Sequence, residues 1–308
     1  MSVLKQVNLK RMPVNRKLIA WCFVVTGVVS GFFWARGGGK MVDPTPEVKS
    51  LKISYIVGET DSSRETNRLV AALRKKLAQA TGDWTVWVYR LDERKGYGIN
   101  EDKIMPAASI MKVPIMLAVW EAVGRGDLDW DKSYTLREGD KQNGSGPIEF
   151  MDAGTQLTVS RLVAEMMNKS DNTAPVILTR LVGKDEVIRG IKRLSMEDTN
   201  FEENTTTAYD VSLAWRKIYD LADTQMQGWL KDSIYEERIP AGVPGDVEVL
   251  HKVGSDAGIW ADSGIVMAPK PFILVIMNRE VNQDQAKTLV PEITKSIWDF
   301  ETGRSAGK

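Results

Sequence analysis

A chain of 308 residues, 43% hydrophobic and 27% charged, can bury a substantial core, which excludes an intrinsically disordered or low-complexity protein. The formal net charge is zero, but residues 1–40 hold seven basic residues and no acidic one, so residues 41–308 carry 34 basic and 41 acidic side chains. This acidic excess argues against a nucleic-acid-binding surface. The single cysteine, Cys22, and the single histidine, His251, exclude an internal disulfide and argue against a His-rich zinc site.

The first element in chain order is an uncharged apolar run at residues 18–35, whose 18 residues are the lower limit for a membrane-spanning helix. Five basic residues precede it, so the positive-inside rule places residues 1–17 in the cytoplasm and the rest of the chain outside. A cleaved signal peptide is the alternative, but no clear small-x-small cleavage site follows the run, which favours an uncleaved anchor. Residues 36–50 mix glycine, proline and charge, as a linker does.

Beyond the linker, hydrophobic periodicity predicts strands at both ends of the remaining chain and helices in its middle. The predicted helices span residues 65–80, 110–123, 157–168, 174–181, 207–222 and 283–300, and the predicted strands span residues 84–89, 247–253, 259–267 and 272–277. This order is typical of an α+β protein with an inserted helical subdomain.

A serine and a lysine lie three residues apart at the start of a predicted helix, at Ser109 and Lys112. This spacing puts both side chains on one helix face, and the helix N-terminus favours negative charge developing on the serine. A semi-buried lysine has a lowered pKa and can then accept the serine proton. The same Ser-x-x-Lys pattern occurs twice more in the chain, so the pair alone is also consistent with a surface lysine near a helix cap.

Two further motifs follow in the chain. Ser170-Asp171-Asn172 is the only such tripeptide, and it offers a hydroxyl that can relay a proton and an amide that can bind a substrate amide. An ordinary helix N-cap is the alternative. Lys252-Val253-Gly254 lies on a predicted strand, where glycine allows close approach of a ligand and lysine supplies a cation for a carboxylate. His251 is expected to face away from this site and to be structural.

In this order, S-x-x-K, S-D-N and K-x-G resemble the signature of the class A β-lactamase and penicillin-binding family. The resemblance covers roughly residues 55–303, and it includes the glycine-serine turn at residues 143–147 and the strand at residues 258–266. It implies a five-stranded antiparallel sheet flanked by helices plus an all-helical subdomain, within one hydrolase domain at residues 51–308. Together with the apolar run at residues 18–35, it implies a single-pass protein of the bacterial cell membrane with that domain outside the cytoplasm.

The resemblance assigns the catalytic roles residue by residue. It implies that Ser109 attacks a lactam or peptide carbonyl to form an acyl-enzyme and that Lys112 acts as the base or orients it. Ser170 would pass a proton to the leaving nitrogen, and Lys252 would bind the substrate carboxylate. No metal or other cofactor is implied, and the expected partner is a β-lactam or a peptidoglycan stem peptide.

The substrate-binding roles follow from the same resemblance. Asn172 would hold the substrate side-chain amide, and Gly254 and Ser255 would lie along the bound substrate, with the backbone amides of Ser109 and Ser255 forming an oxyanion hole. One departure is Val253, which stands where the family usually has threonine or serine. Affinity for carboxylate-bearing ligands is expected to suffer from the missing hydroxyl.

The second departure concerns release of the acyl group. Class A enzymes use a glutamate on a long loop, with an asparagine four residues later. Here the candidate loop at residues 195–204 is short, and Glu197, Glu202 and Glu203 all lack that asparagine. The leading hypothesis is β-lactam hydrolysis, and the alternatives are a penicillin-binding D-alanyl-D-alanine carboxypeptidase-like enzyme or a cell-envelope binding module without catalysis. The oligomeric state stays open.

Overall fold

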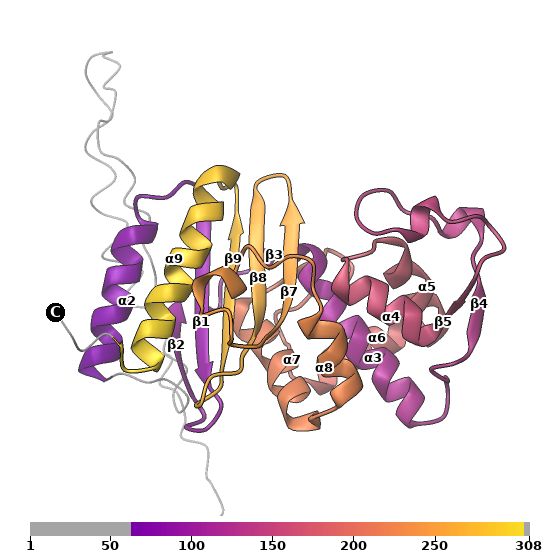
Figure 1. The fold of residues 1–308 in the computed structure, drawn as a ribbon, viewed down its shortest axis with the longest axis horizontal. Helices are drawn as coiled ribbons and strands as arrows, with labels where there is room; N and C mark the ends of the chain where they lie inside the picture. Colours follow the sequence, from indigo (N-terminus) through magenta and orange to yellow (C-terminus); the bar gives the residue numbers. More distant parts are fainter. Residues whose placement is uncertain (1–62, 305–308) are drawn as a thin grey trace, which may run out of the picture. The chain divides into compact units, whose positions relative to one another are not determined.

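Five antiparallel strands form the central sheet of the computed structural model, which describes residues 63–304 (Figure 1). Their order across the sheet is β2-β1-β9-β8-β7. The strands are β1 (Asp83–Arg90), β2 (Lys95–Ile99), β7 (Val249–Asp256), β8 (Ile259–Val266) and β9 (Phe272–Arg279). Strands from the two ends of the described chain therefore meet at the β1–β9 ladder, where Trp87 pairs with Val275.

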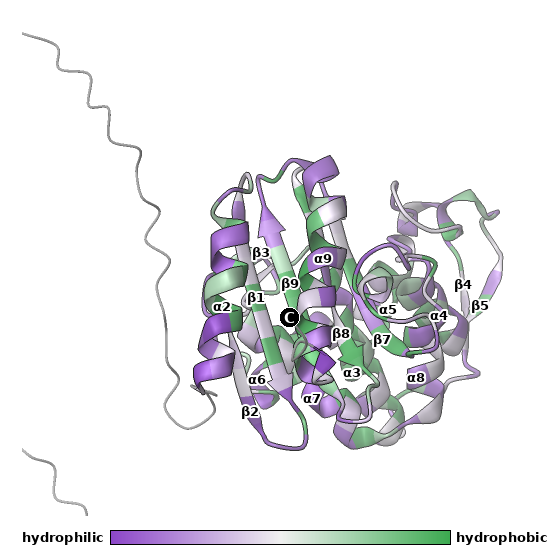
Figure 2. Ribbon diagram, turned by 60° about the vertical axis from the view of Figure 1, so that its left-hand side comes forward, coloured by the Kyte–Doolittle hydropathy of each residue, from purple (hydrophilic) through white to green (hydrophobic). Residues whose placement is uncertain are grey.

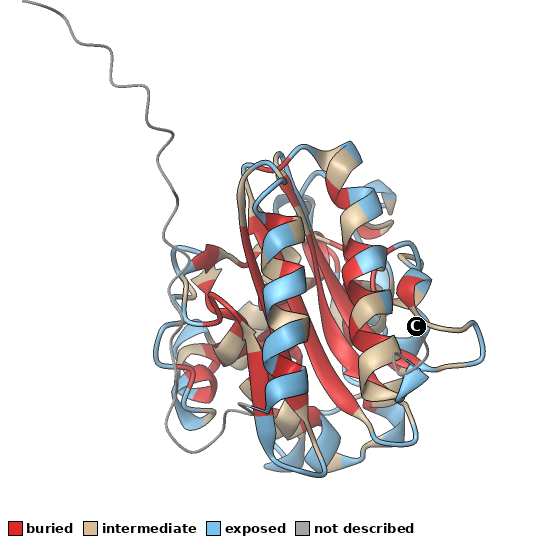
Figure 3. Cartoon of the chain, turned by 90° about the vertical axis from the view of Figure 1, so that its left-hand side faces the viewer, coloured by how far each residue is buried: buried red, intermediate tan, exposed pale blue. Residues whose placement is uncertain are grey.

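The central strand β9 has the sequence FILVIMNR, and every residue of it except Arg279 is buried. A continuous apolar run of this kind is expected only where both faces of a sheet are covered. Figure 2 shows the hydrophobic residues concentrated in the strands, and Figure 3 shows the strands buried beneath helices whose outer faces are exposed. The core is thus divided by the sheet into two layers.

One face of the sheet is covered by α2 (Arg64–Leu77) and α9 (Gln283–Glu301), which lie side by side in Figures 1 and 3. Each begins at a polar cap: the Ser63 hydroxyl accepts a hydrogen bond from the Thr66 amide, and the Asn282 side chain accepts one from the Gln285 amide. Such caps satisfy backbone donors that the first helical turn leaves free. The first and the last helix of the described chain therefore form this layer.

The other face is covered by α7 (Ala208–Leu221), which packs on β1, β8 and β9. Beyond α7 lies a helical subdomain built on α3 (Lys112–Gly124), whose residues from Lys112 to Val119 are all buried. Around α3 lie α4 (Val159–Asn168), α5 (Thr173–Val182), α6 (Lys184–Arg193) and α8 (Thr224–Lys231). Two short ladders complete the fold: β3 (Met105–Pro106) with β6 (Thr205–Thr206), and β4 (Ser133–Thr135) with β5 (Gln156–Thr158).

The α+β class and the five-stranded antiparallel sheet with a helical subdomain are confirmed. Periodicity did not predict β2, because this strand contains Gly96 and Gly98, and both lie against Trp87. A Cβ at Gly96 would lie 2.2 Å from the Trp87 ring, so packing favours glycine here over a typical strand residue. The short helices α6 and α8 were also not predicted.

The predicted cytoplasmic segment, membrane anchor and linker, at residues 1–17, 18–35 and 36–50, lie outside the described residues. Within residues 63–304, none of the helices combines the length and the apolar character needed to span a bilayer.

Removal of side-chain volume from the centre of the sheet is expected to destabilise the domain strongly. Ile276→Ala on β9 should lower the free energy of unfolding by about 3 kcal/mol, because the side chain is fully buried and the cavity cannot collapse between two helix layers. Chemical denaturation monitored by circular dichroism measures this change. The matched control is Ile234→Ala, since the Ile234 side chain is 62% exposed; an equal loss in both variants would contradict the proposed packing.

Candidate active site

Ser109 lies on a tight turn that joins the sheet layer to the helical subdomain. The preceding strand β3 pairs with β6, and the Ala107 amide donates to the Asn204 carbonyl at 2.8 Å. Ala108 has a positive φ of 47° and begins a short 3₁₀ helix, η1 (Ala108–Met111), that continues directly into α3. A non-glycine residue in the left-handed region is held there by its surroundings, and such strain is common at functional sites. The half-buried Ser109 is therefore presented at a constrained point of the fold.

Lys112 begins α3 one turn after Ser109, and its side chain is buried. The Nζ atom donates hydrogen bonds to the Ser170 carbonyl at 2.5 Å, the Ser170 Oγ at 3.2 Å and the Asn172 Oδ1 at 2.9 Å. Burial lowers the pKa of Lys112 to about 7, although the negative charge of Asp171 partly opposes this change. A substantial fraction of this amine is therefore neutral near neutral pH and able to accept a proton.

The Ser170-Asp171-Asn172 segment connects α4 and α5 and has two functions in the structure. The Asp171 carboxylate is fully buried and accepts hydrogen bonds from the amides of Thr173 and Ala174, each at 2.8 Å, so this residue does cap α5. Ser170 has a positive φ of 54°, and its oxygens and that of Asn172 turn toward Lys112. The helix-cap interpretation is therefore correct for Asp171, while the flanking side chains contribute to the candidate site.

The glycine-serine turn at residues 143–147 lies directly against this segment. The Asn172 amide donates to the Ser145 carbonyl at 2.9 Å, and the Asn172 Nδ2 donates to the Asn143 carbonyl at 3.1 Å. Gly146 has a φ of 97°, and a Cβ there would lie 2.2 Å from the Asp171 carboxylate. Only glycine fits this position without movement of the backbone, so the turn fixes Asn172 from the side opposite Lys112.

Lys252 lies on the edge strand β7, and its side chain is buried with no hydrogen-bond partner for Nζ among the described residues. Burial lowers its pKa well below the ordinary value, and the positive charge of Lys112 lowers it further. Two residues later, a Cβ at Gly254 would lie 3.0 Å from the Ala107 carbonyl, so β7 packs closely against the turn that carries Ser109. Ser255 follows and is exposed, whereas Val253 is buried.

The structure therefore brings together all seven residues predicted for the site. They come from η1, the start of α3, the α4–α5 connection and β7, namely Ser109, Lys112, Ser170, Asn172, Lys252, Gly254 and Ser255. Their chemical roles remain predictions.

Arg238 also belongs to this site and was missed by the sequence analysis. Its buried guanidinium donates to the carbonyls of Gly254 at 3.0 Å and Ala261 at 2.5 Å, and to the Ser255 Oγ at 2.6 Å. The guanidinium also lies 3.8 Å from the centre of the Trp260 ring. No local pattern marks Arg238 in the sequence, because it lies in an irregular segment between α8 and β7.

The loop at residues 195–204 carries the three glutamates considered for acyl-group release, and all three are exposed. Glu202 forms an ion pair with Lys184 at 2.5 Å, and the Asn200 side chain accepts the amides of Glu202 and Glu203. The loop ends in the β3–β6 ladder beside Ser109. These contacts agree with the prediction that the glutamates are solvated loop residues.

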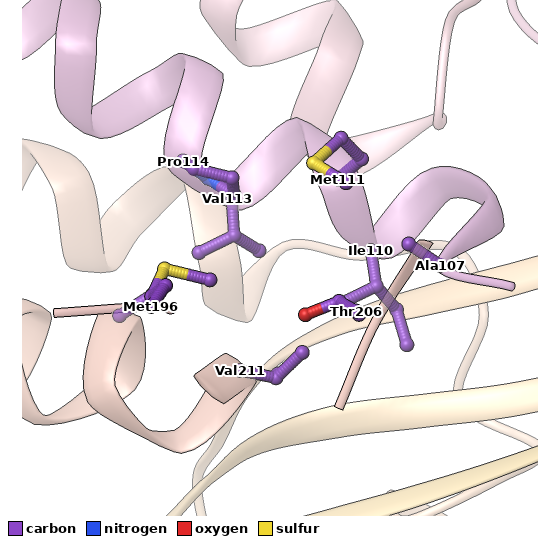
Figure 4. A pocket seen from close by; sticks show the side chains of 9 residues that line it. Ala107, Ile110, Met111, Val113, Pro114, Met196, Thr206 and Val211 are labelled. Carbon is purple, nitrogen blue, oxygen red and sulfur yellow. The ribbon is translucent and has the colours of Figure 1, made fainter. Parts of the chain in front are cut away.

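A small cavity of about 10 Å³ lies behind the Ser109 turn, between that turn, the 195–204 loop and α7. Figure 4 shows its lining side chains, and Thr206 contributes the only oxygen among the labelled ones. The Thr206 hydroxyl already bonds to the Thr199 hydroxyl at 2.7 Å. An apolar cavity of this size does not hold an ordered water, because water needs two or more polar partners.

Within residues 63–304, no group of three or more His, Cys, Asp or Glu side chains is arranged to hold a metal ion.

Comparison with known proteins agrees with this geometry. The Beta-lactamase enzyme family matches residues 68–300. The chain is 23% identical to β-lactamase VEB-1 of Pseudomonas aeruginosa over 279 residues, which covers 78% of this chain and 92% of the relative. It is similar in structure to a β-lactamase of Sphaerobacter thermophilus (26% identity, TM-score 0.69, covering 76% and 96% of the two chains). It is also similar to a PBP-A variant solved as an acyl-enzyme complex with penicillin G (20% identity, TM-score 0.70, 77% and 96%). Because the family match spans most of its length, the chain belongs to the β-lactamase enzyme family.

Proposed function

We propose that the protein is a serine hydrolase of the class A β-lactamase type that forms an acyl-enzyme with β-lactams through Ser109. One observation carries this proposal: the Lys112 amine is buried one turn from Ser109, bonds the hydroxyl of Ser170, and has a pKa of about 7, so its neutral form is present near neutral pH. Lys112 can take the Ser109 proton as the carbonyl is attacked, either directly or through the Ser170 hydroxyl. The acyl-enzyme that penicillin G forms in the PBP-A variant supports the same step here.

The leaving nitrogen needs a proton when the lactam bond breaks. In the proposed reaction the Ser170 hydroxyl donates that proton and is recharged from Lys112, since the two groups are already 3.2 Å apart. The tetrahedral oxyanion would be held by the backbone amides of Ser109 and Ser255, which are brought close by the packing of Gly254 on Ala107. Each step uses a group that is fixed before substrate binds.

The substrate is proposed to carry a carboxylate. Lys252 is a buried amine with no partner among the described residues, and a bound carboxylate would supply the missing negative charge. Val253 offers no hydroxyl, but Arg238 holds the Ser255 hydroxyl at the same end of β7, where that hydroxyl can bond the carboxylate. Both β-lactams and peptidoglycan stem peptides end in such a group.

Penicillin-binding, carboxypeptidase-like activity is a second candidate, because the structure offers little to activate the hydrolytic water. Glu197, Glu202 and Glu203 are exposed, and the small cavity behind Ser109 is apolar. Without a positioned base the acyl group leaves slowly, since general base catalysis typically contributes a factor of about 10² to 10⁴. Acylation residues are common to both candidates, so only the release rate separates them.

The anchor at residues 18–35 is part of the proposal. We place the hydrolase domain outside the bacterial cytoplasm, tethered to the cell membrane by this apolar run, because its preceding basic residues favour retention of the N-terminus inside.

Covalent labelling with a fluorescent penicillin tests the nucleophile. The wild-type chain should carry one label that survives denaturing gel electrophoresis, and Ser109→Ala should abolish it because no hydroxyl remains to form the ester. Ser133→Ala is the matched control, since Ser133 is an exposed serine on β4. Labelling that persists in Ser109→Ala would contradict the assigned nucleophile, and an unlabelled wild type would favour a binding module without catalysis.

Release of the label is expected to be slow. After removal of free penicillin, the acyl-enzyme should persist over many minutes, because the three glutamates of the 195–204 loop are exposed and poorly placed to activate water. Gel fluorescence at successive times measures its decay. Loss of label within seconds would instead establish efficient β-lactam hydrolysis and would require a base that the loop at residues 195–204 does not present.

The acylation rate should depend on pH through the lysine. Below pH 7 the rate constant should rise about tenfold per pH unit as Lys112 loses its proton, and it should level off above its pKa of about 7. Stopped-flow measurement of the acylation rate from pH 5 to 9 gives the profile. Lys112→Arg should be inactive at every pH, since a guanidinium stays protonated; a flat wild-type profile would exclude Lys112 as the titrating base.

A further inference from the structure

A buried ion pair lies behind the substrate end of β7, on the side of the strand opposite Lys252. The His251 Nδ1 contacts both oxygens of Asp262 at 3.1 Å, and both side chains are fully buried. The two residues lie on adjacent strands, since Asp262 pairs with Val253 in the β7–β8 ladder. The negative charge of Asp262 raises the pKa of His251 to about 9 against the opposing effect of burial, so the imidazole is charged near neutral pH.

Asp262 also accepts two backbone hydrogen bonds in addition to its ion pair with His251. Its Oδ2 atom accepts the Ile239 amide at 3.0 Å, and its Oδ1 atom accepts the Ser263 amide at 2.9 Å. Ile239 follows Arg238 in the irregular segment between α8 and β7, where no strand ladder holds the backbone. The contact with Asp262 therefore fixes the peptide unit that carries Arg238.

Arg238 links this fixed peptide unit to the end of β7. Its guanidinium reaches the Gly254 carbonyl, the Ala261 carbonyl and the Ser255 hydroxyl, and it stacks on Trp260. A continuous set of contacts thus runs from the buried ion pair through Ile239 and Arg238 to the exposed Ser255 hydroxyl near the end of β7. Removal of one partner from a buried ion pair leaves an uncompensated charge, which disturbs whatever that charge was holding.

We propose that His251 and Asp262 are positioning residues that fix Arg238, and through it the Ser255 end of β7, for recognition of the substrate carboxylate. This inference rests on the proposed function, because it assigns the pair to the carboxylate subsite of the same reaction. The pair touches neither the substrate nor the reacting atoms. The exposed Glu236 also lies near the pair, with its Oε1 3.6 Å from the His251 Nε2, and the charge of Asp262 also acts on Arg238 and Lys252.

Acylation kinetics of the full chain with benzylpenicillin and with its uncharged methyl ester test this proposal. Asp262→Asn and His251→Ala should weaken formation of the pre-acylation complex with benzylpenicillin by about tenfold, the size expected for one hydrogen bond to a charged group. The acylation rate at saturation and the reaction with the methyl ester should change little. His251→Asn should restore part of the loss, because its side-chain amide can still donate to Asp262.

A comparison of single and double variants uses Ser255→Ala, which removes the exposed hydroxyl at the end of this series of contacts. In that background Asp262→Asn should cost distinctly less than in the wild type, because residues acting through one series are not additive. Equal losses for benzylpenicillin and its methyl ester, or full additivity with Ser255→Ala, would overturn the proposal in favour of a purely structural ion pair.

Hydrogen–deuterium exchange gives a readout that does not require acylation. Asp262→Asn and His251→Ala should speed exchange locally at residues 236–242 and 253–256 while the remainder of the domain stays protected. Unchanged protection at Ile239 would overturn the positioning role even if the enzyme is active. A wild type that is not acylated, but whose variants show this local exchange, would instead contradict the proposed function and leave the structural link intact.

Discussion

The candidate site depends on the hydrogen bonds that the buried Lys112 side chain makes to Ser170 and Asn172. A lysine amine removed from water loses several kcal/mol of hydration unless protein acceptors replace that water. Here three oxygens do so, two from Ser170 and one from Asn172. Because these acceptors lie on the connection between α4 and α5, one side chain both fixes that connection beside Ser109 and acquires a pKa near 7.

The neighbouring elements hold this arrangement through backbone geometry. Asp171 accepts three amides, from Ile148, Thr173 and Ala174, so its charge is satisfied without a cation. Among the described residues Lys112 has no direct ion pair, and burial lowers its pKa. The close approach of β7 at Gly254 then places the second buried lysine across the site, where the positive charge of Lys112 adds to burial in lowering the pKa of Lys252.

The residues proposed for acylation and those considered for release of the acyl group differ in their burial and in their hydrogen bonds. Lys112, Ser170 and Lys252 are buried, and Lys112 bonds Ser170, whereas the glutamates of the 195–204 loop are exposed and Glu202 pairs with Lys184. The end of this loop pairs with the strand before Ser109 in the β3–β6 ladder. In this member of the β-lactamase enzyme family, the groups proposed for acyl-enzyme formation are therefore more buried than the glutamates considered for release of the acyl group.

The sequence by itself determined the main helices, four of the five sheet strands near their observed bounds, and the three motifs that identify the site. These features depend on local periodicity and on residue order, which are read along the chain. Only the tertiary structure decided that Lys112 is buried against Ser170, that Asp171 is a cap while its neighbours face the site, and that Arg238 reaches Ser255. The contacts of Lys112 and Arg238 join residues 16 or more positions apart, and burial, hydrogen bonding and pKa depend on what surrounds a side chain in space.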